Sequence, residues 1–481
     1  MDLFRTKPLA KLLLQASDSS HGLKRTLTAR GLIALGIGAI IGAGLFVRTA
    51  AASGEAAGPA VVLSFVFAAI GCLFAGLCYA EFASMIPIAG SAYTYAYTTM
   101  GELVAWIIGW ALVLEYAFGA GTVSIAWSEY LNKLTGGAIP YAWCHSPFEA
   151  QPGTGVHGIM DIPALFIVLI LTLLLIKGTS ESATVNAIIV AIKVGIVLAF
   201  IAIGWSFIST ANHTPFFIPE GIKGHEGFFQ HGWGGVLRGA GIVFFAFIGF
   251  DAVSTAAQET INPGRDMPIG ILGSLAVCTV LYILFGWVLT GVAPYPEFLQ
   301  AGKEASVAYA IQHHMPGFGW LATLVTVAIL AGFSSVILVM LMGGSRVFFT
   351  MACDGLLPDM FSAVHPKFRT PYKSNIIVFC FVAILSSFVP GDLLGDLTAI
   401  GTLFAFVLVC VGIWILRVKN PGQHRPFKTP LVPLVPILGV LFCITMIISL
   451  DSYTQLVAFI WMLIGLVVYF VYGRSHSRLN A

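Results

Sequence analysis

Charged side chains are scarce in this sequence. Aspartate, glutamate, lysine and arginine make up 10% of its 481 residues, hydrophobic residues make up 58%, and the mean hydropathy is +0.92. Because soluble globular proteins carry about 25% charged residues, this composition excludes that class. The net charge of +2 gives no basis for binding nucleic acid.

The sequence also lacks the motifs of common enzymes and metal sites. It contains no GxxxxGK[ST], HExxH or GxSxG pattern, so we expect no enzymatic activity. Six of its eight cysteines lie in apolar segments, and Cys144 is alone in its loop, which leaves no basis for a disulfide framework. No spacing of metal ligands occurs either. We therefore expect no metal and no cofactor.

Long apolar segments dominate the chain. Each membrane-spanning helix needs roughly 20 apolar residues, and the sequence predicts about twelve such segments. The fold class is therefore an all-α polytopic membrane protein, with loops too short for a second domain. The predicted spans are 32–52, 59–85, 103–130, 161–177, 183–208, 234–258, 268–292, 318–343, 374–389, 393–416, 431–450 and 452–472.

Lysine and arginine are distributed unequally between the two sides of the membrane. If the N-terminus is cytoplasmic, 18 of the 24 lie on the cytoplasmic side, five lie outside, and Lys193 lies within a span. Since basic loops stay in the cytoplasm, we predict a multi-pass plasma-membrane protein with both termini cytoplasmic. The first 31 residues are polar and basic, so we expect no cleavable signal peptide in them.

Glycines interrupt two of the apolar segments. Four fall within 36–44 of the first span, and three fall within 239–249 of the sixth, which is followed by Asp251. Glycine costs about 1 kcal/mol in a helix interior, so each interruption needs an explanation. Close helix packing is one, and a helix break whose backbone faces a ligand is the other. Because two apolar segments are interrupted in the same way, helix breaks are favoured over close packing.

Five helices separate the starts of the two interrupted spans. Because five is odd, the second copy enters the membrane from the opposite face, which is the geometry of an inverted repeat. The sequence thus predicts three regions. They are an N-terminal cytoplasmic tail at 1–31, a ten-helix transport core at 32–416 with repeats at 32–208 and 234–416, and two accessory helices with a short cytoplasmic C-terminus at 417–481.

The interrupted spans resemble helices of the amino acid–polyamine–organocation (APC) superfamily. The segments GIGAIIGAGLF at 36–46 and FAFIGFD at 245–251, followed by ETINP at 259–263, carry the resemblance. The likeness is closest to the cationic amino acid transporter subfamily, through GEL at 101–103 and ACDGLL at 352–357. It implies a secondary transporter with the five-plus-five inverted-repeat fold of the leucine transporter type, interrupted helices 1 and 6, and two accessory helices.

The predicted substrate site lies at the two breaks. Free N–H groups and the positive end of the helix dipole after the first break suit a carboxylate. Carbonyl groups at both breaks can receive an ammonium group, as similar positions do in the superfamily, and a phenylalanine at the second break would cap the site. The predicted substrate-binding residues are Ile40, Ile41, Gly42, Ala43, Gly44, Phe245, Ala246, Phe247 and Ile248.

Three charged residues are predicted to couple transport to protons. Lys193 should lie near the first break and near Ser334 and Ser335, the region that coordinates sodium in sodium-dependent relatives of this fold. The ammonium group of Lys193 would take the place of that sodium ion. In the alternative, Lys193 only bridges helices as a fixed ammonium group, and this role also predicts sodium independence. Glu115, at the centre of the third span, is the leading proton carrier, and Asp251 is the second candidate.

The predicted function is proton-coupled uptake of L-amino acids by alternating access. The side chains that can be assigned to the walls of the site are apolar, which favours small neutral substrates such as alanine. The alternative is a sodium-independent transporter or exchanger of arginine and lysine, with Glu115 as the counter-ion. A channel would show no saturable exchange. The expected partners are the amino acid, protons and membrane lipids, and the chain is expected to work as a monomer, with a small membrane subunit left open.

Overall fold

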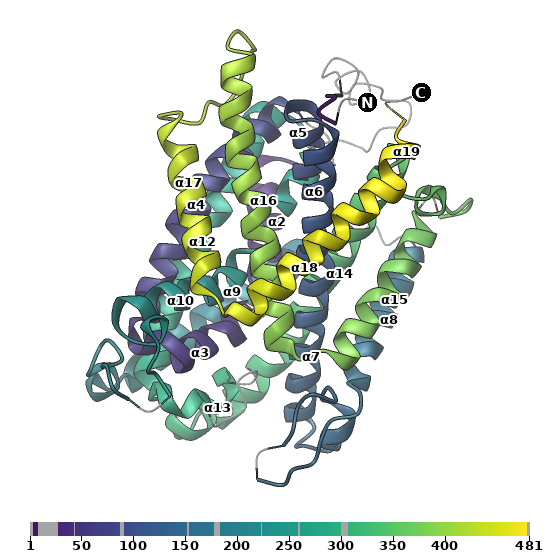
Figure 1. Ribbon diagram of the computed structural model, residues 1–481. Helices are drawn as coiled ribbons and strands as arrows, with labels where there is room; N and C mark the ends of the chain where they lie inside the picture. Colours follow the sequence, from purple (N-terminus) through teal and green to yellow (C-terminus); the bar gives the residue numbers. More distant parts are fainter. Residues whose placement is uncertain are drawn as a thin grey trace.

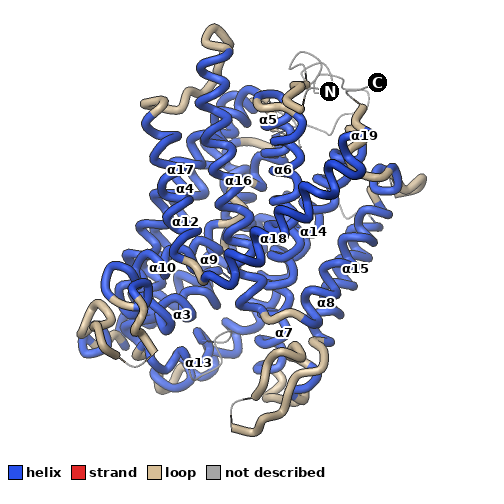
Figure 2. Tube along the Cα trace, in the orientation of Figure 1, coloured by secondary structure: helices blue, strands red, loops and turns tan. Residues whose placement is uncertain are grey.

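The computed structural model is built from helices and connecting loops (Figures 1 and 2). Among the residues that it describes there is no β-strand. Those residues are 3–7, 27–42, 44–86, 91–151, 153–177, 183–222, 224–257, 260–299, 306–368 and 370–478.

Each of the twelve predicted spans corresponds to helical structure. Within the described ranges, eight helical stretches are long and apolar enough to cross a membrane, and four shorter apolar helices accompany them. The prediction of an all-α polytopic membrane protein is confirmed. The helices that form the spans are α2 (Ala29–Ile40) and α3 (Thr49–Ala52), α4 (Val61–Met85), α6 (Glu102–Val113) and α7 (Gly119–Leu134), α8 (Ile162–Lys177), α9 (Ala183–Gly204), α10 (Gly232–Phe244) and α11 (Ala252–Thr255), α12 (Pro263–Val292), α14 (Gly319–Cys353), α15 (Tyr372–Phe388), α16 (Gly391–Lys419), α17 (Leu434–Ser449) and α18 (Ser452–Val468).

The first span is broken near its middle. α2 ends at Ile40, and Ile41 is extended, with φ −73° and ψ 103°. The chain resumes as a π-helical turn, η1 (Gly44–Arg48), from which α3 continues. The glycine-rich sequence therefore marks a helix break and not the close packing of an uninterrupted helix.

The sixth span is broken at the matching position. α10 passes into a single 3-10 turn, η9 (Phe245–Phe247), and Ile248 is extended. Gly249 has φ +111°, a conformation that glycine adopts without steric cost, and α11 begins at Ala252. The predicted interruption of the first and sixth helices is thus confirmed.

Two features differ from the predicted spans. α14 runs to Cys353, well past the predicted end at 343, because the helix continues after the apolar segment ends near Arg346. Two nine-residue helices, α5 (Ser91–Thr99) and α13 (Ser306–His314), were not predicted. A search for segments of roughly 20 apolar residues does not detect helices of this length.

The two ends of the described chain meet at Asp354, just after α14. Lys7 Nζ donates to its carboxylate at 2.8 Å, and the Tyr93 hydroxyl donates to it at 2.9 Å. The backbone N–H of Arg478 donates to the Asp354 carbonyl at 3.0 Å. Both ends therefore lie at one end of the molecule (Figure 1), as an even number of spans requires.

Candidate functional site

The two breaks pack directly against each other. A Cβ atom added to Gly44 would lie 2.2 Å from the Cα atom of Ala246, and one added to Gly249 would lie 2.9 Å from the Ala39 carbonyl oxygen. Any side chain at either position would push the broken helices apart. Glycine is thus required here by close backbone approach as well as by conformation.

Tyr282 of α12 joins the two breaks, and sequence reasoning missed it. Its hydroxyl lies 2.9 Å from the Ile40 carbonyl oxygen and 2.8 Å from the Ala246 carbonyl oxygen, and its side chain is completely buried. Both carbonyls were predicted to receive the substrate ammonium group. The only signal in the sequence was a tyrosine within an apolar span, since a buried tyrosine hydroxyl needs a partner.

Lys193 of α9 bridges the first broken helix to α14. Its Nζ atom donates to the Gly38 carbonyl at 2.9 Å and to the Ser335 hydroxyl at 2.8 Å, and its side chain is buried. Ser334 donates instead to the Leu330 carbonyl of its own helix. Of the predicted serine pair, Ser335 is therefore the residue that the structure brings to the lysine.

Glu115 and Asp251 face each other in the protein interior. Glu115 lies in a π-helical turn, η4 (Leu114–Phe118), a form of helix frequent at functional sites. Both carboxyl groups are fully buried, and the Tyr116 hydroxyl donates to Asp251 at 3.2 Å, whereas neither carboxylate oxygen of Glu115 has a hydrogen-bond partner among the described residues. Burial disfavours the charged form of a carboxyl group, so this pair is a candidate for holding a proton in the protein interior.

The remaining predicted site residues lie around the breaks. Phe247 packs edge-on against Tyr282, with ring centroids 5.3 Å apart, whereas Phe245 is buried without such a ring pair among the described residues. A Cβ atom on Gly42 would come within 3.0 Å of a Val336 methyl group, so α14 forms a wall of the first break. The predicted residue Ala43 lies outside the described residues.

An ionic cluster lies on the side of the breaks away from the chain ends. Arg48, at the end of η1, pairs with Asp392 at 3.2 Å and with Asp396, both on α16. These residues line a cavity of about 800 Å³. The sequence signal was the spacing of the two aspartates, which places them on one helix face. Their arginine partner, more than 340 positions away, could not be recognised.

The comparison with known proteins identifies the family. Residues 27–472 match the family model for amino acid permeases. This chain belongs to the amino acid permease family. The permease is 44% identical to the branched-chain amino acid permease BcaP of Bacillus subtilis (strain 168), and 40% identical to the methylthioribose transporter of the same organism, each over 99% of both chains.

A plant relative supports the predicted subfamily. The permease is 35% identical to the vacuolar cationic amino acid transporter 4 of Arabidopsis thaliana, over 87% of this chain and 68% of that protein. The resemblance to the APC superfamily and to its cationic amino acid transporters is thereby confirmed. The family and these relatives are permeases and transporters, and the chain is not an enzyme.

The contact between the breaks gives a first prediction. Gly44→Ala should abolish the stabilisation of the permease by amino acids, because the new methyl group collides with the backbone of Ala246. Overpacking of this kind costs about 1–3 kcal/mol. Thermal unfolding of the purified permease, with and without amino acids, measures both effects. Gly195→Ala is the matched control, since a Cβ atom there meets no atom within 4 Å.

A milder variant separates loss of binding from loss of folding. In Gly42→Ala the added methyl group meets only a side-chain methyl of Val336, at 3.0 Å, so the fold should persist while amino acid affinity falls. Normal amino acid binding by both site variants would place the substrate elsewhere in the molecule.

Proposed function

We propose that the permease takes up neutral aliphatic L-amino acids, alanine among them, by proton-coupled and sodium-independent alternating access. The proposal includes a monomeric protein in the plasma membrane with both termini in the cytoplasm. In it, repeats 32–208 and 234–416 form the transport core, and 417–481 forms an accessory pair of helices.

The arrangement of the breaks supports an amino acid backbone as the ligand. The chain after Gly42 starts a new helical turn, whose free N–H groups suit a carboxylate. The carbonyls of Ile40 and Ala246 lie close enough to share one hydroxyl, that of Tyr282. A substrate ammonium group can use the second lone pair of each oxygen, or displace Tyr282 from them.

The observation that carries sodium independence is the position of Lys193. Its ammonium group already donates to a carbonyl of the first broken helix and to a hydroxyl of α14. Carbonyl and hydroxyl oxygens are also the ligands of a bound metal cation. A fixed positive charge in this position supports sodium independence, and in this proposal another ion drives accumulation.

The buried Glu115–Asp251 pair supports protons as that ion. It lies between η4 and the second break, so a change in its protonation acts directly on the substrate site. One charge that crosses a potential of 100 mV provides roughly 2.3 kcal/mol. At about 1.36 kcal/mol per tenfold concentration ratio, that energy supports nearly two decades of accumulation.

Two kinds of evidence support neutral aliphatic substrates. Three of the side chains beside the breaks, Phe245, Phe247 and Val336, are apolar. BcaP, which shares 44% of its residues with this chain, is named for branched-chain amino acids. The specific observation that favours arginine or lysine is the acidic pair itself, since an ionised Glu115 or Asp251 would neutralise a cationic side chain.

A substrate panel separates these alternatives. The purified permease should be stabilised by alanine, valine, leucine and isoleucine, by about 2.7 kcal/mol at a concentration 100 times the dissociation constant. Thermal shift is the first measurement, and counterflow in proteoliposomes is the second. Methylthioribose belongs in the panel because of the second relative. Stabilisation by arginine and lysine, with none by the neutral amino acids, would make Glu115 a specificity residue.

Sodium independence is a second expected outcome. Replacement of all sodium by potassium should leave the initial rate of amino acid uptake by proteoliposomes unchanged, because Lys193 holds the cation position. Lys193→Gln should lower that rate at least tenfold, since hydrogen bonds of a charged donor contribute about 1.5–3 kcal/mol each. Uptake that rises steeply with sodium concentration contradicts the assignment.

The role of Glu115 gives a third outcome. Glu115→Gln should still exchange internal for external amino acid but should no longer accumulate it when the outside is made acidic, because the amide neither takes up nor releases a proton in this pH range. Asp251→Asn, in the same assay, reports on the partner carboxyl group. If Glu115→Gln retains acid-driven accumulation, the proton is carried by Asp251 or Lys193.

A further inference from the structure

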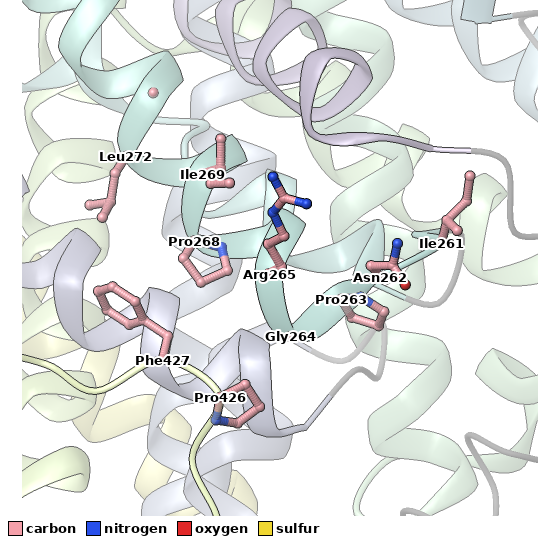
Figure 3. A pocket seen from close by; sticks show the side chains of 11 residues that line it. Ile261, Asn262, Pro263, Gly264, Arg265, Pro268, Ile269, Leu272, Pro426 and Phe427 are labelled. Carbon is pink, nitrogen blue, oxygen red and sulfur yellow. The ribbon is translucent and has the colours of Figure 1, made fainter.

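A large cavity opens at the end of the molecule that carries the chain ends, outside the substrate site. Its volume is about 970 Å³, and it lies between the start of α12 and the loop that connects α16 to α17. Figure 3 shows Phe427 of that loop beside Pro268 and Leu272 of α12, and Pro426 beside Gly264. No step of the proposed transport function uses this cavity.

One positive charge dominates the cavity. Arg265 is the only charged residue among the eleven that line it, and its side chain is exposed and lies in the middle of the view in Figure 3. It forms no ion pair or hydrogen bond with another described side chain. The neighbouring Asp266 is buried and does not line the cavity. The amide of Asn262, also exposed, adds a hydrogen-bond donor on the same wall.

An apolar groove continues from the cavity along the membrane-spanning part of α12. This α4–α12 groove has a volume of about 340 Å³ and shares Leu272 with the cavity. Apart from Thr279 its lining is entirely apolar. The lining residues are Val66, Ala69, Ile70 and Leu73 of α4, and Leu272, Leu275, Ala276, Thr279 and Ile283 of α12.

The dimensions fit one leaflet of a bilayer. At 1.5 Å per helical residue, the distance from Ile269 to Thr279 along α12 is about 15 Å, half of a hydrocarbon core of about 30 Å. Arg265 lies one turn further out, at the level expected for lipid headgroups. A molecule that reaches from the arginine into the groove therefore needs an anionic head and a chain as long as one leaflet is thick.

The walls of the cavity are firmly anchored. Arg417 donates two hydrogen bonds of 2.8 Å to the fully buried carboxylate of Glu81, which also accepts the N–H of Thr429 at 2.8 Å. The N–H of Phe427 approaches the Ser84 hydroxyl at 3.4 Å. The loop is thus held against α4, and the cavity is a preformed feature of the fold.

We propose that the cavity at Arg265 and the α4–α12 groove together bind one anionic phospholipid. Its phosphate pairs with the Arg265 guanidinium and accepts from Asn262, and one acyl chain lies along Leu272, Ala276 and Thr279. Charge complementarity selects the phosphate, since arginine binds it through two parallel hydrogen bonds. The continuous apolar lining selects a lipid over a free anion, because a free anion gains nothing from the groove. Basic pockets between membrane helices suit such headgroups.

The test is lipid binding by the purified full-length protein in a neutral detergent. Dioleoyl phosphatidylglycerol should raise the unfolding temperature, and native mass spectrometry should detect one tightly retained molecule, with dioleoyl phosphatidylcholine retained more weakly. Arg265→Gln should weaken phosphatidylglycerol binding about fivefold, the effect of one basic residue near an anionic surface. Ala276→Phe, which fills the groove from an exposed position, should weaken it without removing charge.

Two matched controls complete the design. Lys367→Gln removes an exposed charge away from the cavity, and Val280→Phe enlarges an exposed residue of α12 outside the groove. Both should bind phosphatidylglycerol as the unchanged protein does. Equal binding of the two lipids, or an equal effect of Lys367→Gln and Arg265→Gln, overturns the proposal. The proposal is also overturned if inorganic phosphate alone raises the unfolding temperature as much as the lipid does. It is likewise overturned if a single-span peptide copurifies in place of the lipid. Because binding is measured without transport, failure here leaves the proposed function untouched.

Discussion

Every backbone polar group released by a helix break inside a membrane must find a partner within the protein, and this requirement organises the centre of the molecule. The carbonyl of Gly38 receives the ammonium group of Lys193. The carbonyls of Ile40 and Ala246 share the single hydroxyl proton of Tyr282. Helices α9 and α12, which are themselves unbroken, thus supply the donors that the two broken helices lack.

The same groups connect stability to transport. In the proposed function, a substrate ammonium group uses the same carbonyls as Tyr282, and a separation of α2 from α14 stretches the hydrogen bonds by which Lys193 joins the two helices. Such charged hydrogen bonds contribute about 1.5–3 kcal/mol each. One charge moving through 100 mV supplies a similar energy, roughly 2.3 kcal/mol. In the proposed transport cycle, breaking one of the two hydrogen bonds of Lys193 is therefore comparable in energy to the movement of one charge through that potential.

The sequence was most informative where the signal is local. Twelve apolar segments could be found from hydropathy, and both breaks from clustered glycines, because each depends on neighbouring residues. The sequence does not reveal contacts between residues that are distant in the chain. Tyr282 and Ile40, for example, are 242 positions apart. Ser334 and Ser335 show the limit within one helix. Adjacent residues point about 100° apart, so one of the two can face Lys193, and the sequence alone does not say which.

Helix α12 connects the proposed substrate site to the proposed lipid site. Tyr282 lies 17 residues after Arg265, about 25 Å along the helix axis, so the residue that contacts both breaks and the residue proposed to bind the phosphate belong to one helix. A lipid held by the α4–α12 groove restrains this helix against α4, while the breaks hold it through the tyrosine hydroxyl. Any shift of α12 that frees the carbonyls for substrate also changes the shape of the groove. Under these two proposals the lipid and the substrate act on the same helix, so a coupling between them requires no further moving part.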